Sequence, residues 1–135
     1  MTPSEAFAAV ALVSVSCDGS LSREEARALR SQLEGRSPYR ELSEQAMGDL
    51  FDRLLERLRQ EGWRALLSAA IGQLTPPQQE TALAMAVHLV HCDRSVEPQE
   101  QELLEDMASQ LDLSAERSRL IIDVIGVLNR DSLAA

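Results

Sequence analysis

A nine-residue phrase occurs twice in this sequence, 75 positions apart. Residues 17–25 read CDGSLSREE and residues 92–100 read CDRSVEPQE, so both copies follow the pattern C-D-x-S-(L/V)-x-x-x-E. When residues 9–29 are aligned with residues 84–104 at the same separation, 8 of the 21 positions are identical. We interpret this as an internal duplication, which predicts two similar turns in one fold, within repeat halves of about 3–35 and 76–111.

The signals for secondary structure predict an all-α fold. The chain has 135 residues, the size of one domain, so we expect a single domain over residues 1–135. Hydrophobic residues make up 44% of the chain but aromatic residues only 3%, which favours closely packed helices. Capping residues such as Thr2, Ser22 and Ser114, and prolines such as Pro98, indicate helix starts. We expect seven helices, over about 3–17, 22–34, 41–61, 63–71, 76–92, 98–111 and 114–128, so that central helices join two helix-turn-helix repeats related by a pseudo-two-fold axis.

The duplicated phrase places two carboxylates at each turn. Asp18 follows the end of one helix and Glu25 lies in the first turn of the next, and Asp93 and Glu100 repeat this spacing. If the two halves pack about a pseudo-two-fold axis, the four carboxylates can converge on one point. Oxygen ligands in that number suit a hard divalent cation, so the sequence predicts a Ca²⁺ or Mg²⁺ site.

A purely structural role explains the same acids. Glu25 stands three residues after Ser22, which is the spacing of a capping box, and an acid there also complements the helix dipole. Asp18 is an ordinary turn residue. A true EF-hand is disfavoured, because Ser14 and Ser16 would occupy two positions that need ligands.

A second candidate site combines thiol and imidazole groups. His88 and Cys92 lie four residues apart on one predicted helix, and Cys17 is the repeat mate of Cys92. Together they offer tetrahedral nitrogen and sulfur ligands for Zn²⁺, or thiols for a reactive oxyanion such as tellurite. The alternative is that both cysteines are small buried residues that end their helices.

Charge and hydropathy exclude several classes of function. Thirteen basic and 22 acidic residues leave a net charge of −9, which repels nucleic acid and anionic membranes and attracts cations or basic protein surfaces. No apolar run is long enough to span a membrane, and the start does not resemble a signal peptide, so we expect a cytoplasmic protein with reduced thiols. No catalytic triad or phosphate-binding loop is recognisable, so we expect no enzyme.

The last predicted helix is strongly apolar. We expect Leu120, Ile121, Val124, Ile125 and Leu128 to face the core. Any exposed part of this stretch would seat a partner, or a second copy of the chain in a homodimer.

Paired helices with the pattern A-x₆-D-G-x-(hydrophobic)-x₃-E resemble the TerB-like family of tellurite-resistance proteins. The matching residues are Ala11, Asp18, Gly19, Leu21 and Glu25 in the first copy, and Ala86, Asp93, Val96 and Glu100 in the second. The resemblance implies a compact fold of about seven helices, with acidic residues proposed to bind divalent metal. It also implies a role in tellurite and stress resistance, including membrane-attached complexes. Arg94 departs from the pattern at the position of Gly19, which would weaken an ion site in the second turn.

Taken together, these features predict a non-enzymatic TerB-like domain that binds a divalent cation through Asp18, Glu25, Asp93 and Glu100. The alternative is a metal-independent adaptor whose acidic face docks a basic protein partner.

Overall fold

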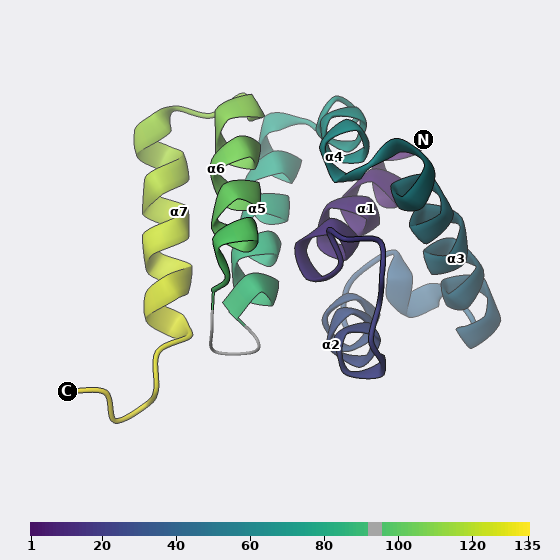
Figure 1. Ribbon diagram of the computed structural model, residues 1–135, viewed down its shortest axis with the longest axis horizontal. Coiled ribbons are helices and arrows are strands. Elements are labelled where there is room, and N and C mark those ends of the chain that lie inside the picture. The colour runs from purple at the N-terminus through teal and green to yellow at the C-terminus, as the bar shows by residue number, and fades with distance from the viewer. Residues whose placement is uncertain (92–95) are drawn as a thin grey trace.

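A computed structural model describes residues 1–91 and 96–135. Within these two ranges the chain folds into seven α-helices and one short 3₁₀ turn, with no strand (Figure 1). The all-α prediction is therefore confirmed. The elements are α1 (Pro3–Val15), α2 (Arg23–Glu34), η1 (Tyr39–Glu41), α3 (Glu44–Glu61), α4 (Trp63–Ile71), α5 (Pro76–Val90), α6 (Pro98–Gln110) and α7 (Ala115–Leu128).

Local sequence determines where most helices begin. The side-chain oxygens of Thr2, Ser22 and Thr75 each accept a hydrogen bond from the backbone N–H three residues on, and the side chain at that later position accepts one from the backbone N–H of the cap residue. Ser43 and Ser114 cap α3 and α7 with a side-chain oxygen alone. Such caps satisfy backbone donors that the helix itself leaves unpaired, and each contributes about 1 kcal/mol. The predicted caps at Thr2, Ser22 and Ser114 are confirmed.

The centre of the fold is α1. Eight of its residues, Ala6, Ala8, Ala9, Val10, Ala11, Leu12, Val13 and Ser14, are buried. They point in every direction around the helix, because α1 packs against α2, α3, α4 and α5 at once. A helix that is apolar on all sides is stable only inside such a core, and its alanines allow the neighbouring helices to approach closely.

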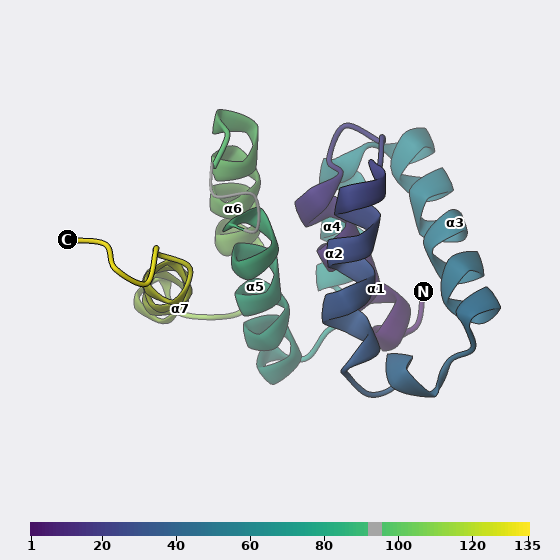
Figure 2. The same ribbon diagram turned by 90° about the horizontal axis from the view of Figure 1, so that it is seen from below.

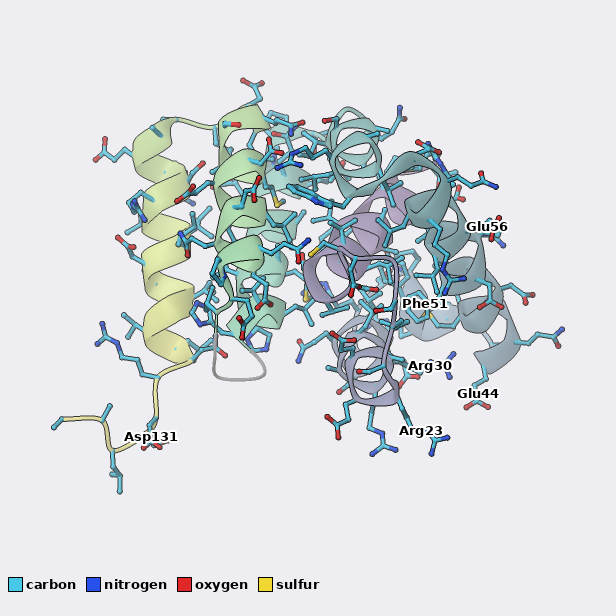
Figure 3. The ribbon with its side chains drawn as sticks, viewed as in Figure 1. Arg23, Arg30, Glu44, Phe51, Glu56 and Asp131 are labelled. Atoms are coloured by element: carbon cyan, nitrogen blue, oxygen red, sulfur yellow. The ribbon has the colours of Figure 1, made fainter. Side chains whose placement is uncertain are left out.

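The remaining helices form two groups around α1. In Figure 2, α2, α3 and α4 surround α1 on one side, while α5, α6 and α7 continue outward on the other. α5 lies between α1 and α7, and α7 lies at the end of the structure opposite α3. The side-chain view shows Arg30 of α2 reaching Glu44 at the start of α3, with 3.6 Å between the guanidinium and the carboxylate (Figure 3).

The structure corrects several predicted boundaries and core positions. α1 ends at Val15 and α5 at Val90, each two residues before the predicted end, and α3 begins at Glu44 because Ser43 provides its cap. In α7, the residues Leu120, Val124 and Leu128 are exposed rather than buried. Periodicity alone could not separate the two faces of α7, because both are apolar.

Candidate acidic cleft

The first acidic turn is organised by its own polar groups. Oδ1 of Asp18 accepts hydrogen bonds from the backbone N–H of Ser20 at 3.0 Å and from its hydroxyl at 2.9 Å. These bonds stabilise the carboxylate and hold the pKa of Asp18 below its ordinary value, the bond from the Ser20 backbone contributing most. Gly19 has a φ of +84°, a conformation that glycine adopts without strain. The turn therefore stabilises an ionised Asp18.

An arginine from a distant helix also supports this turn. Nε of Arg59, in α3, donates a hydrogen bond of 2.9 Å to the carbonyl oxygen of Gly19. The sequence places Arg59 on what looks like an ordinary solvated helix face, so local pattern could not predict the contact. Helix α3 thus anchors the segment that carries Asp18.

The second acid of each repeat acts as a capping residue. Oε1 of Glu25 accepts from the N–H of Ser22 at 2.9 Å, and Oε1 of Glu100 accepts from the N–H of Glu97 at the same distance. Ser22 and Glu97 occupy aligned positions of the duplicated phrase, so both copies retain a capping box. The structural role considered for Glu25 is therefore confirmed, and Glu100 has the same role.

These acids nevertheless line one cleft. A hollow of about 230 Å³ lies between the end of α1 and the starts of α2 and α6. Its acidic lining residues are Asp18, Glu25, Glu97 and Glu100, and the others are Ser14, Val15, Cys17 and Gln99. The fourth predicted acid, Asp93, lies outside the described residues. Three of the four predicted carboxylates therefore share one cleft.

A second hollow adjoins the first. It has a volume of about 490 Å³, shares Val15, Glu25 and Glu100 with the cleft, and adds Glu24 and Leu89 among its lining residues. No lysine or arginine belongs to the described lining of either hollow. We call the two together the acidic cleft. Glu24 and Glu97 were not predicted as site residues, although the alignment of Glu97 with the cap Ser22 was a usable signal.

Cys17 is affected by the acids of the cleft. Burial raises the pKa of its thiol, and the negative charges of Asp18, Glu100 and Glu25 raise it further. This thiol therefore resists ionisation, which makes it a poor nucleophile and a poor metal ligand in its protonated form.

The carboxylates of the cleft are of the ligand type and charge that a hard cation prefers, but they do not form a preorganised coordination site. Within residues 1–91 and 96–135, no three histidine, cysteine, aspartate or glutamate side chains are arranged to hold a metal ion. For the predicted zinc set, Nδ1 of His88 lies 3.2 Å from the side-chain nitrogen of Asn129 in α7, whereas Cys17 lines the acidic cleft. Cys92 is outside the described residues, so that set stays a prediction.

Comparison with known proteins identifies the family. The family model for tellurite resistance protein TerB matches residues 4–122. The chain belongs to the TerB family. Neither the curated proteins nor the solved structures include a match. The TerB match runs from α1 into α7 and spans both copies of the acidic phrase, so the recognition based on that phrase is confirmed.

The described helices of this TerB domain give no sign of a membrane span. In the ranges 1–91 and 96–135, no helix is both long enough and apolar enough to cross a bilayer. The longest, α3, has 18 residues but carries charged side chains along its exposed face.

Proposed function

We propose that this TerB domain is a non-enzymatic binding module of tellurite or stress resistance, acting in the cytoplasm, and that its acidic cleft binds a hydrated divalent cation. The observation that carries the proposal is the lining of the cleft, which includes Asp18, Glu25, Glu97 and Glu100 and, among the described lining residues, no cationic side chain. Carboxylates gathered in this way repel one another, and a Ca²⁺ or Mg²⁺ ion would relieve that repulsion.

Hydration explains how a cation could bind without three acids in direct contact with it. Mg²⁺ usually keeps several waters and is held by one or two carboxylates, so the remaining acids can act through bridging water. Asp18, Glu25 and Glu100 would then bind the ion directly or through its waters, with Asp93 as the fourth proposed ligand. Glu25 and Glu100 each accept the backbone hydrogen bond of the cap through Oε1. The negative charge of a carboxylate is shared by both of its oxygens, so Oε2 would be the oxygen that faces the cation.

The hydroxyl and thiol groups of the cleft support a non-enzymatic role. The Ser14 hydroxyl donates to the carbonyl of Val10 at 2.8 Å, within its own helix. Cys17 is held as a neutral thiol by the raised pKa described above. Neither group is activated as a nucleophile by these surroundings.

Thermal unfolding with added Ca²⁺ or Mg²⁺, at constant ionic strength, tests the cation. A cation at a hundred times its dissociation constant stabilises the fold by about 2.7 kcal/mol. We expect this gain for the wild type and its loss in Asp18→Asn/Glu100→Gln, whose amides still accept the turn and cap hydrogen bonds. The matched control is Asp49→Asn/Asp52→Asn, which removes the same charge from exposed positions of α3. Equal responses of all three proteins would exclude binding at the cleft.

The second candidate is a metal-independent adaptor. It is favoured by one specific observation: Glu25 and Glu100 cap helices and Asp18 closes its own turn, so each acid has a structural role without an ion. The acidic surface would then dock a basic protein, for example in a membrane-attached resistance complex. Partner binding that survives a chelator but weakens with salt would favour this function over the first.

A further inference from the structure

Helix α7 carries an apolar stripe that no other part of the described chain covers. Leu120, Val124, Val127 and Leu128 are 50%, 54%, 53% and 70% exposed, and their spacing places them on one side of the helix. We call these four residues the α7 stripe. The adjoining side, with Ile121, Ile122 and Ile125, is partly buried and packs against the core. In Figures 1 and 2, α7 lies at one edge of the molecule and has neighbouring helices, α5 and α6, on one side only.

The charges around the stripe distinguish it from the rest of the surface. Between residues 116 and 131 the acids Glu116, Asp123 and Asp131 are balanced by Arg117, Arg119 and Arg130. The segment is therefore neutral, whereas the whole chain has a net charge of −9. Two copies of so acidic a protein repel each other in most relative orientations. The repulsion is weakest in the orientation that brings neutral, apolar surfaces together.

We infer that the α7 stripe binds the α7 stripe of a second copy, with the two helices antiparallel and the two-fold axis near Val124. Leu120 and Leu128 each lie four residues from Val124, so this axis places Leu120 of one copy against Leu128 of the other. A pairing of this kind is self-complementary, and it closes at two copies instead of forming a chain.

The ends of α7 provide charge complementarity for the same orientation. Glu116 lies in the first turn of α7 and Arg130 just after its last residue. An antiparallel pair about Val124 places Glu116 of one copy within about two residues of Arg130 of the other, an offset of about 3 Å that two long side chains can span, and this occurs at both ends. A parallel pair would instead bring Glu116 against Glu116 and Arg130 against Arg130. Arg117 is already paired with Glu80 of α5 in its own chain, so we assign the intermolecular role to Arg130.

The contact is small, and this limits its strength. One helix face on each side buries less than the roughly 1,200 Å² that mark the lower end of stable complexes, so we expect weak association, with a dissociation constant on the order of 100 μM. The dimer would leave the acidic cleft accessible, because the cleft lies between α1, α2 and α6 and does not involve the stripe.

Sedimentation equilibrium between about 10 μM and 1 mM tests the pairing at concentrations on both sides of that constant. With a chelator present to keep cation effects out, the wild-type mass should rise from 14.9 kDa toward twice that value. Val124→Glu places two like charges at the axis and should weaken association at least about tenfold. The control is Leu42→Glu, which makes the same change at a residue that is 41% exposed in the linker before α3. A wild type that stays monomeric, or equal effects of the two variants, would overturn the inference.

A charge exchange tests the antiparallel orientation without touching the apolar residues. Glu116→Arg and Arg130→Glu should each weaken the dimer, because each creates two like-charge contacts. The double variant restores opposite charges and should return the dissociation constant to within about threefold of the wild type. If the double variant associates no better than the single ones, the antiparallel geometry is wrong. Far-UV circular dichroism confirms that each variant is folded.

Discussion

Substitution of Gly19 by alanine offers a quantitative test of how the first acidic turn is built. A φ of +84° costs an L-residue about 1–2 kcal/mol. The new Cβ would also lie 3.3 Å from Cγ of Arg59, so that side chain must shift, which weakens its hydrogen bond to the Gly19 carbonyl. Alanine also reduces the conformational entropy of the unfolded chain, which offsets this loss by about 0.4–1 kcal/mol of folding free energy. We therefore expect a net destabilisation of about 1–2 kcal/mol.

Gly35→Ala is the matched control for this substitution. Gly35 has a φ of −80°, and a Cβ there meets nothing within 4 Å, so the same change should stabilise the fold by about 0.4–1 kcal/mol. Urea unfolding followed by circular dichroism at 222 nm measures both variants. The difference between them should be about 2 kcal/mol, with opposite signs relative to the wild type. If Gly19→Ala is as stable as the wild type, the described turn conformation is wrong.

The contribution of Arg59 can be separated in the same experiment. In an Arg59→Ala background the steric contact and the hydrogen bond are both absent, so Gly19→Ala should cost only the backbone term. A double-mutant cycle then reports the coupling between the two residues, which we expect to be about 0.5–1 kcal/mol. A coupling of zero would show that Arg59 does not support the turn in solution.

Two further predictions concern titratable groups of the cleft. The lowered pKa of Asp18 stabilises the fold above the pKa of its unfolded form, about 3.9, and this contribution is lost as the pH falls through the folded pKa. Urea unfolding at pH 6 and pH 3 should therefore show a smaller loss of stability on acidification for Asp18→Asn than for the wild type, and an equal or larger loss would contradict the assigned hydrogen bonds. For Cys17, the rate of reaction with a disulfide reagent, measured against pH in a Cys92→Ser variant, should have its midpoint above that of the same chain in urea. A midpoint equal to the unfolded value would show that burial and the neighbouring acids do not act on this thiol.

Much of the fold could be predicted because helix signals are local. Caps such as Ser22 and Ser114 act on backbone groups within the same turn, so their effect does not depend on the rest of the molecule. The boundaries that were wrong lie where local signals are weakest. The end of α1 was placed too late because the residues after Val15 are compatible with a helix. The start of α3 was placed too early because no sequence signal before Ser43 predicts the 3₁₀ turn at Tyr39–Glu41. The duplicated phrase likewise sufficed for recognition of the family, because its residues recur at a fixed spacing.

The sequence by itself therefore determined the helices, their caps and the presence of an acid at each duplicated position, since these depend on neighbours along the chain. Only the tertiary structure decided which acids meet. It placed Glu97 and Glu100, at the start of α6, in the same cleft as Asp18 and Glu25, and it brought Arg59 against Gly19 from 40 positions away. It also decided which side of α7 remains uncovered, because apolar residues occur on more than one side of this helix and the local pattern does not show which of them will pack against the core.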